Sequence, residues 1–397
     1  MFFYSNLKEF LDGQENKNEA LLKIRNTILS INLIKIVANS DEDSYTIFEI
    51  LNARGQELED FELLKNYIMR FIVPIESRDE AKTKWESIEN LLGTNLKTFI
   101  KHYAKHKFSN SKEKSAYRVI QKSTRGKNIN ELLDDLVLKA SYYEKFVSPR
   151  DKGDNSNCTT NEARIFRFFK TKRAQQYRPI LLSVMHQKDL GNIDENKYNE
   201  FLNYLYNFFV CFTIIGKSKS NRLEDVINKY SEILENHFSN TNMNEFAKKL
   251  KDRIPSQDWF NNTFKNVGYS NHVDVYKGEE NKETTKLVLK LIEEYISQST
   301  ITDDFTIEHI LPDSENSEEN CQIGNLIPLE ENLNNKCKDK SIKDKFPLYD
   351  KSKFSSARGI KSRYSNKEFN AESRTEYLSK LIYNNILELN QLDYSSD

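Results

Sequence analysis

Apolar residues recur every three or four positions through most of this chain. From about residue 80 to residue 298 the spacing is helical throughout. One apolar face, for example, combines Leu132, Leu133, Leu136, Ala140 and Tyr143. The polar stretch 148–161, with one Pro and one Gly, predicts a surface loop between helices. The pattern therefore predicts a mainly α protein with a long helical middle.

The N-terminal part departs from this spacing. The β-branched run 31–38 predicts a strand, and residues 45–51 predict a short helix. A second helix is expected over 59–71, with apolar residues at 61, 64, 68 and 71, and Pro74 would end it. Residues 1–76 are therefore expected to mix helix and strand.

The last hundred residues change character again. The runs 305–311 and 323–329 are short and β-like, and an acidic loop over 313–322 separates them. Residues 331–345 are compatible with a helix. The pattern predicts strand, loop, strand and helix within about 40 residues.

Composition supports this reading. Only 11 Gly and 7 Pro in 397 residues favour long uninterrupted helices, and the length predicts two or three folding units. The four cysteines form no CxxC pair, which favours a reducing compartment. Because no apolar run approaches the roughly 18 residues of a membrane span, we expect a cytoplasmic protein without a membrane partner.

The net charge of −1 excludes a protein that binds nucleic acid by bulk charge alone. The charges are nevertheless segregated. Residues 301–335 carry nine acidic and no basic residues, whereas 336–367 carry eleven basic and three acidic ones. An acidic segment beside a basic one suits a site that attracts a cation and binds the phosphates of DNA. The lysines expected to contact phosphate are Lys336, Lys338, Lys340, Lys345, Lys351 and Lys353.

A candidate site lies in the same region. Glu308 and His309 end the first predicted strand, Asn325 opens the second, and the predicted helix brings Asn334 back over both. A neutral imidazole can deprotonate water near pH 7, and a carboxylate with an amide oxygen suits a hard divalent cation, Mg²⁺ before Mn²⁺. The alternative is a structural histidine whose partners are backbone groups, with asparagines that cap turns.

These residues resemble a known motif. Glu308–Pro312, Ile323–Leu329 and Asn334 are similar to the HNH (His-Me finger) nuclease motif, in the version found at the C-terminus of GmrSD-type restriction endonucleases. The family's following Lys, Tyr and Ser match Lys345, Tyr349 and Ser352.

The resemblance implies a ββα-metal domain in which His309 is the general base and Asn325 an orienting residue. It also implies that Glu308 and Asn334 are metal ligands. Many HNH enzymes carry Asp and His at the positions of Glu308 and Asn334.

The N-terminal segment resembles the same family. Residues 48–58 and 61–67 are similar to the end of its ParB-like domain, where Asn52 and Gly55 would build a tight polar turn. The family's upstream nucleotide-handling motif is absent, since residues 12–14 lack its arginine and lie too near the turn. We therefore expect a truncated α/β ParB-like remnant, no nucleotide cofactor or hydrolysis by this chain alone, and a second polypeptide or a shortened gene.

Together these patterns predict a remnant domain at 1–76, a helical middle at 77–300 and an HNH-like domain with a C-terminal helix at 301–397. The predicted function is a metal-dependent HNH-type endonuclease that cuts DNA, modified DNA among its candidate targets, in a prokaryotic restriction or anti-phage system. The alternatives are a non-catalytic DNA-binding or regulatory subunit, and an RNase or abortive-infection toxin.

Overall fold

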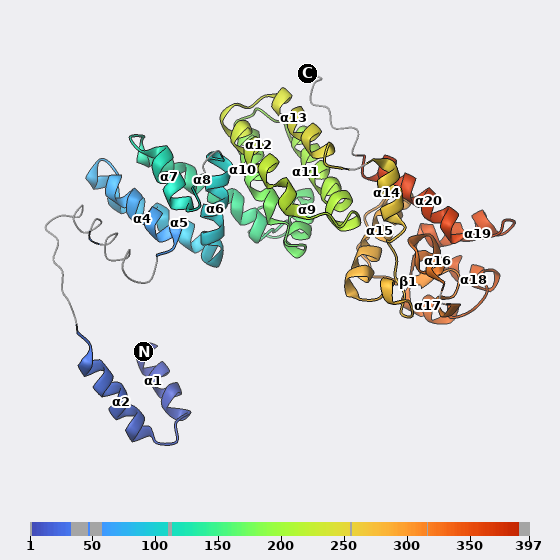
Figure 1. The fold of residues 1–397 in the computed structure, drawn as a ribbon, viewed down its shortest axis with the longest axis horizontal. Coiled ribbons are helices and arrows are strands. Elements are labelled where there is room, and N and C mark those ends of the chain that lie inside the picture. The colour runs from blue at the N-terminus through green and yellow to red at the C-terminus, as the bar shows by residue number, and fades with distance from the viewer. Residues whose placement is uncertain are drawn as a thin grey trace. The chain divides into compact units, whose positions relative to one another are not determined.

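The computed structural model describes residues 2–32, 47, 58–109, 113–254, 256–315 and 317–388, and the chain divides into two units, 1–58 and 59–397. The first unit contains α1 (Phe2–Asp12) and α2 (Lys17–Ser30) (Figure 1). The Asn16 side chain caps α2 by accepting a hydrogen bond from the Glu19 amide.

Three N-terminal predictions fall largely on undescribed residues. The strand expected over 31–38 lies outside the described residues from position 33 onward, and of the helix expected over 45–51 only Ile47 is described, as helical. The turn with Asn52 and Gly55 also lies outside them.

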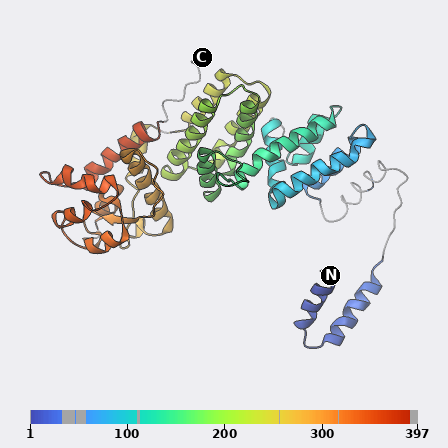
Figure 2. The ribbon, with the colours of Figure 1, turned by 180° about the vertical axis from the view of Figure 1, so that it is seen from behind.

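The second unit begins with helices, as predicted (Figures 1 and 2). They are α4 (Asp60–Phe71), α5 (Arg78–Leu92), α6 (Leu96–Lys107), α7 (Ala116–Thr124), α8 (Ile129–Val147), α9 (Thr160–Thr171), α10 (Arg178–Asp189), α11 (Glu195–Phe209), α12 (Glu224–Asn236), α13 (Asn240–Lys251), α14 (Gln257–Phe264) and α15 (Glu279–Ser297). The apolar face predicted on α8 is buried, and the predicted loop separates α8 from α9. Among the described residues no helix is long and apolar enough to cross a membrane.

A small antiparallel ladder lies in the C-terminal part. Strand β1 (Thr306–His309) pairs with β2 (Leu326–Leu329), so that His309 lies opposite Leu326. Helices surround the ladder in sequence: α16 (Glu318–Cys321), α17 (Glu331–Cys337), α18 (Ile342–Tyr349), α19 (Ser355–Tyr364) and α20 (Ala371–Leu381). Since α17 contacts β1, and α15 and α19 contact β2, helices cover this ladder.

The second strand is shorter than predicted. Residues 323–325 form a 3₁₀ turn, because the chain there packs against α20: a side chain on Gly324 would meet the Ala371 carbonyl at 2.0 Å. The helix predicted over 331–345 is also interrupted. It ends at Cys337, Lys338 adopts a left-handed φ of 44°, and α18 begins after its cap, Ser341.

An earlier segment of the chain lies beside the start of this turn. The Ile323 amide donates to the Val267 carbonyl at 2.8 Å, and the Tyr269 amide donates to the Cys321 carbonyl at 2.9 Å. Between them Gly268 approaches so closely that a Cβ would lie 2.1 Å from the Cys321 carbonyl oxygen. Only glycine permits this approach, so residues 267–270 form part of the hairpin's surroundings although they precede position 301.

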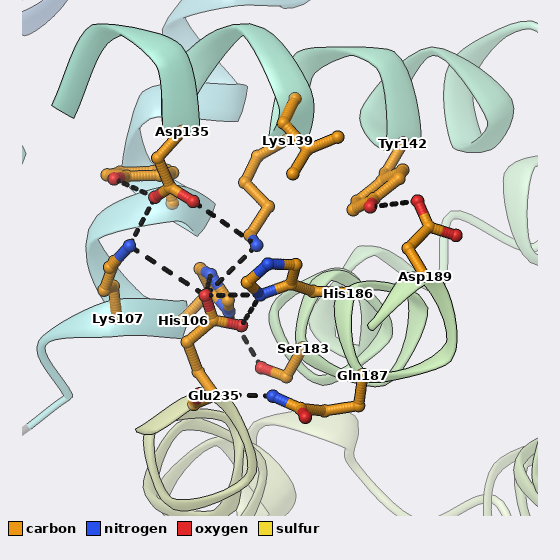
Figure 3. Close-up of polar contacts among 12 residues, drawn as sticks. His106, Lys107, Asp135, Lys139, Tyr142, Ser183, His186, Gln187, Asp189 and Glu235 are labelled. Atoms are coloured by element: carbon orange, nitrogen blue, oxygen red, sulfur yellow. Dashed lines mark hydrogen bonds and ion pairs between the residues drawn. The ribbon is translucent and has the colours of Figure 1, made fainter. Parts of the chain in front are cut away.

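A buried ionic cluster joins α6, α8, α10 and α12 (Figure 3). At its centre lies the Glu235 carboxylate, whose side chain is 3% exposed; Lys139 Nζ lies 3.1 Å from it and His186 Nδ1 2.9 Å. Asp135 lies 3.4 Å from Lys139 and also pairs with Lys107. Two carboxylates and two ammonium groups thus compensate one another, and removal of one would leave a buried charge without a partner.

His106 lies fully buried in the same cluster, with Nδ1 hydrogen-bonded to the Ser183 hydroxyl at 2.8 Å. Burial lowers the pKa of His106 to about 3, although the Glu235 carboxylate acts in the opposite direction. Burial also opposes ionisation of Glu235, but the hydrogen bond with His186 and the positive charge of Lys139 outweigh it and lower the pKa of this carboxyl. At neutral pH the cluster therefore holds an uncharged His106 and an ionised Glu235.

The neutral His106 predicts a specific acid sensitivity. The unfolded chain takes up a proton on His106 below about pH 6.5, whereas the folded chain does not until about pH 3. The free energy of unfolding therefore decreases as the pH is lowered from about 6.5 to about 3. Between pH 7 and pH 5 we expect this residue to cost the wild type about 2 kcal/mol of unfolding free energy.

Urea unfolding at both pH values, on wild type and His106→Asn, measures the difference. The asparagine keeps a hydrogen-bonding group near Ser183 but does not titrate. His237→Asn, at an exposed position, is the control. Equal pH dependence in wild type and His106→Asn would contradict the assignment.

Candidate functional site

The His309 imidazole is positioned by a backbone carbonyl. It ends β1, its side chain is 13% exposed, and Nε2 lies 2.8 Å from the Tyr269 carbonyl oxygen. Because a carbonyl only accepts, the hydrogen must be on Nε2, and the lone pair of the neutral ring lies on Nδ1. No described residue hydrogen-bonds Nδ1. Burial lowers the pKa of His309, which favours the neutral ring near pH 7.

Asp313 is a second acidic neighbour of this ring, which the sequence analysis did not single out. Its Oδ1 lies 3.8 Å from His309 Nε2, and the carboxylate accepts hydrogen bonds from the Ser270 hydroxyl at 2.6 Å and the Asn271 amide at 2.9 Å. The negative charge of Asp313 acts against the burial effect on the pKa of His309. The only sequence signal for it was its place directly after Pro312.

Asn325 fixes the chain that leaves β1. It is fully buried; its Oδ1 accepts from the Leu311 amide at 2.8 Å, and its Nδ2 donates to the carbonyls of Leu311 at 2.8 Å and Asn320 at 2.7 Å. The Ile310 amide also donates to the Asn325 carbonyl. These contacts orient the backbone beside His309 rather than its ring.

Glu308 points into the interior, where it meets a lysine. Its side chain is 4% exposed, Lys345 Nζ lies 2.9 Å from Oε1, and the Tyr349 hydroxyl donates to the same oxygen at 2.9 Å. Lys345 also donates to the carbonyls of His309 at 2.6 Å and Ile310 at 3.3 Å. Burial raises the pKa of Glu308, and Lys345 opposes that effect.

The contacts of Glu308 Oε1 do not favour the metal-ligand role implied for this residue, whereas Asn334 Oδ1 accepts no hydrogen bond from the described residues. A divalent cation at Glu308 Oε1 would share that oxygen with the Lys345 ammonium, and like charges at such a distance repel. The Asn334 amide nitrogen donates to Thr306 Oγ1 at 2.9 Å and to the Ile307 carbonyl at 3.0 Å. In the described part of the chain no three His, Cys, Asp or Glu side chains are grouped to hold a metal ion.

The six lysines expected to bind phosphate fall into two classes. Lys345 is 1% exposed and serves Glu308 and the strand carbonyls, so its ammonium does not face solvent. The other five are exposed: Lys336, Lys338, Lys340, Lys351 and Lys353. Of these, Lys353 pairs with Asp303 at 2.7 Å.

Comparison with known families gave one match in this region. Residues 240–381 match the family model described as GmrSD restriction endonucleases, C-terminal domain. The matched range includes both strands and the residues from Tyr269 to Tyr349 described above, and it confirms the resemblance of this C-terminal part to the family. Comparison with curated proteins gave no match.

The buried pair predicts that Lys345 stabilises the fold. Lys345→Met leaves Glu308 buried without its cation, and we expect the free energy of unfolding to fall by about 3 kcal/mol in urea titrations. Lys343→Met, at an exposed position on the same helix, should change it by no more than about 0.5 kcal/mol. The double variant Lys345→Met/Glu308→Gln should recover part of the loss. Equal losses in Lys345→Met and Lys343→Met would contradict this role.

Proposed function

We propose that this protein, whose residues 240–381 form a C-terminal domain of the GmrSD restriction endonuclease type, is an endonuclease that hydrolyses DNA phosphodiester bonds. The observation that supports it best is the placement of His309. Its Nε2–H is bound by the Tyr269 carbonyl, and its Nδ1 has no partner among the described residues. A mostly buried but reachable neutral imidazole of this kind is suited to accept a proton from water.

In the proposed reaction His309 Nδ1 removes a proton from the water that attacks phosphorus. The ring then carries a positive charge. The Tyr269 carbonyl at 2.8 Å and the Asp313 carboxylate at 3.8 Å both favour that charged form electrostatically. A general base of this kind contributes about 10²- to 10⁴-fold to a reaction rate.

Exposed lysines near the hairpin would bind the flanking phosphates. Lys336, Lys338, Lys340 and Lys351 form no ion pair or side-chain hydrogen bond with any described residue, so their ammonium groups are available. They lie on α17 or on the segments on either side of α18, and α17 packs against β1. Contacts of this type position DNA without reading its sequence.

A requirement for Mg²⁺ or Mn²⁺ enters the proposal from the family resemblance alone. The contacts of Glu308 do not favour this requirement. The proton transfer and the phosphate contacts proposed above do not involve a metal ion. Cleavage assays with Mg²⁺, with Mn²⁺ and in EDTA decide the requirement. A prokaryotic restriction or anti-phage setting, modified DNA as a target and a second polypeptide are likewise proposed on the resemblance.

One observation favours a second candidate function. The Glu308 carboxylate already accepts hydrogen bonds from Lys345 and Tyr349. A hairpin with this internal contact would also suit a non-catalytic DNA-binding or regulatory subunit. That function predicts DNA binding without cleavage under any metal condition.

The role of His309 gives the first functional prediction. His309→Ala should lower the rate of DNA cleavage by about 10²- to 10⁴-fold, because no other group would accept the proton from water. Plasmid nicking measures the rate, and DNA affinity should stay within about twofold. His237→Ala, at an exposed position on another part of the chain, is the matched control. An unchanged rate in a folded His309→Ala protein would refute the catalytic assignment.

The exposed lysines give the second functional prediction. Lys340→Ala should weaken binding to all DNA sequences alike and reduce the slope of log Kd against log salt by about 1, because one phosphate contact is lost. Fluorescence anisotropy over a range of KCl concentrations measures the slope. Lys152→Ala, in the loop between α8 and α9, should leave it unchanged. The same slope in both variants would remove Lys340 from the DNA-binding surface.

A further inference from the structure

A pocket of about 260 Å³ lies beside the segment that holds His309. Its walls come from the π-helical turn Val210–Ile215 after α11, from α14 and the residues that follow it, and from α15. Val267 and Gly268 line it, and the next residue, Tyr269, offers its carbonyl to His309. The pocket is therefore connected to the site above by a single backbone step.

The pocket depends on a glycine that admits an aromatic ring. A Cβ on Gly216 would lie 2.8 Å from the Trp259 ring and 2.7 Å from the Phe212 carbonyl, so no other residue fits there without displacement. The Gly216 amide closes the π turn on the Cys211 carbonyl at 2.9 Å. Turns of this type are rare and frequently occur at functional sites.

In the lining, Asn281 already donates to the Val275 carbonyl at 3.0 Å and to the Lys277 carbonyl at 2.9 Å, whereas the other polar side chains form no such contact with the described residues. Within the described residues, the side chains of Thr263, Asn266 and Thr284 form no hydrogen bond, and Lys217 forms no ion pair. The lining contains no carboxylate. An aromatic ring, one amide without an internal hydrogen bond (Asn266), two hydroxyls and one ammonium group suit a flat ligand with a hydrogen-bonding edge and a negative charge at one end.

A nucleobase on its sugar phosphate has this chemistry. Bases taken out of a helix stack on aromatic side chains and are read along their edges by amides, while lysines contact the phosphate. The volume is slightly below the roughly 300–1,000 Å³ of pockets for drug-sized ligands, which suits a single base.

We propose that this pocket binds one DNA base taken out of the double helix, stacked on Trp259, read by Asn266 and held at its phosphate by Lys217. The proposal rests on the proposed function, because it takes DNA as the substrate. A free nucleotide has the same chemistry and is the other source of such a ligand.

Binding of labelled duplexes to the full-length protein tests the proposal. In EDTA, a duplex with one bulged nucleotide should bind about tenfold more tightly than a fully paired one, because a base that is already unpaired avoids the cost of being taken out of the helix. Asn266→Ala and Lys217→Met should reduce this preference about fivefold or more. The matched controls Asn262→Ala and Lys219→Met, both exposed and outside the pocket lining, should keep it.

A second arm separates the two ligand sources. Under excitation selective for tryptophan the signal comes from Trp85 and Trp259, and Trp85 is fully buried with its indole N–H hydrogen-bonded to Glu89. Quenching of Trp259 by deoxynucleoside monophosphates, with no preference for bulged DNA, would overturn DNA as the source and assign the pocket to a free nucleotide. Equal binding of both duplexes, together with no quenching, would overturn the pocket altogether. Because all binding is measured without cleavage, an inactive nuclease that still prefers the bulge refutes only the proposed function.

Discussion

The Lys345 ammonium is the interaction on which the geometry around β1 depends. It joins the Glu308 carboxylate to the carbonyls of His309 and Ile310, and so ties the end of the strand to α18. Since a buried ammonium is tolerated only with several acceptors around it, the backbone at His309 has little freedom to move. The internal ion pair therefore holds the backbone at His309, and the Tyr269 carbonyl then directs the imidazole ring.

The same pair defines how Glu308 can act. A carboxylate oxygen that already accepts from Lys345 and Tyr349 cannot approach a dication unless those contacts change. In this arrangement the residue that the family motif offers to a metal serves instead as a structural anchor. The two uses of Glu308 Oε1 exclude one another within a single conformation.

Sequence patterns predicted the mainly helical fold, the α4 helix and two short paired segments near His309, because these depend on local periodicity. They did not predict the carbonyl of Tyr269, since a backbone group leaves no trace in residue type and this one lies 40 positions before His309. In the sequence Lys345 lies among the same kinds of charged residues as the exposed lysines near it. Only the folded structure shows that it is buried and pairs with Glu308. The Glu235 cluster was not predicted either, because its members come from α6, α8, α10 and α12, which are far apart in the sequence.

The close approach at Gly268 has a practical consequence for dissecting the protein. Residues 267–270 supply backbone partners to the turn before β2 as well as the carbonyl that holds His309. A fragment that starts at residue 301, where the sequence pattern changes, would contain every side chain of the motif and yet lack the group that selects its tautomer. A fragment of this region, for gene fusion or for isotope labelling, has to begin before residue 267 and therefore includes α15.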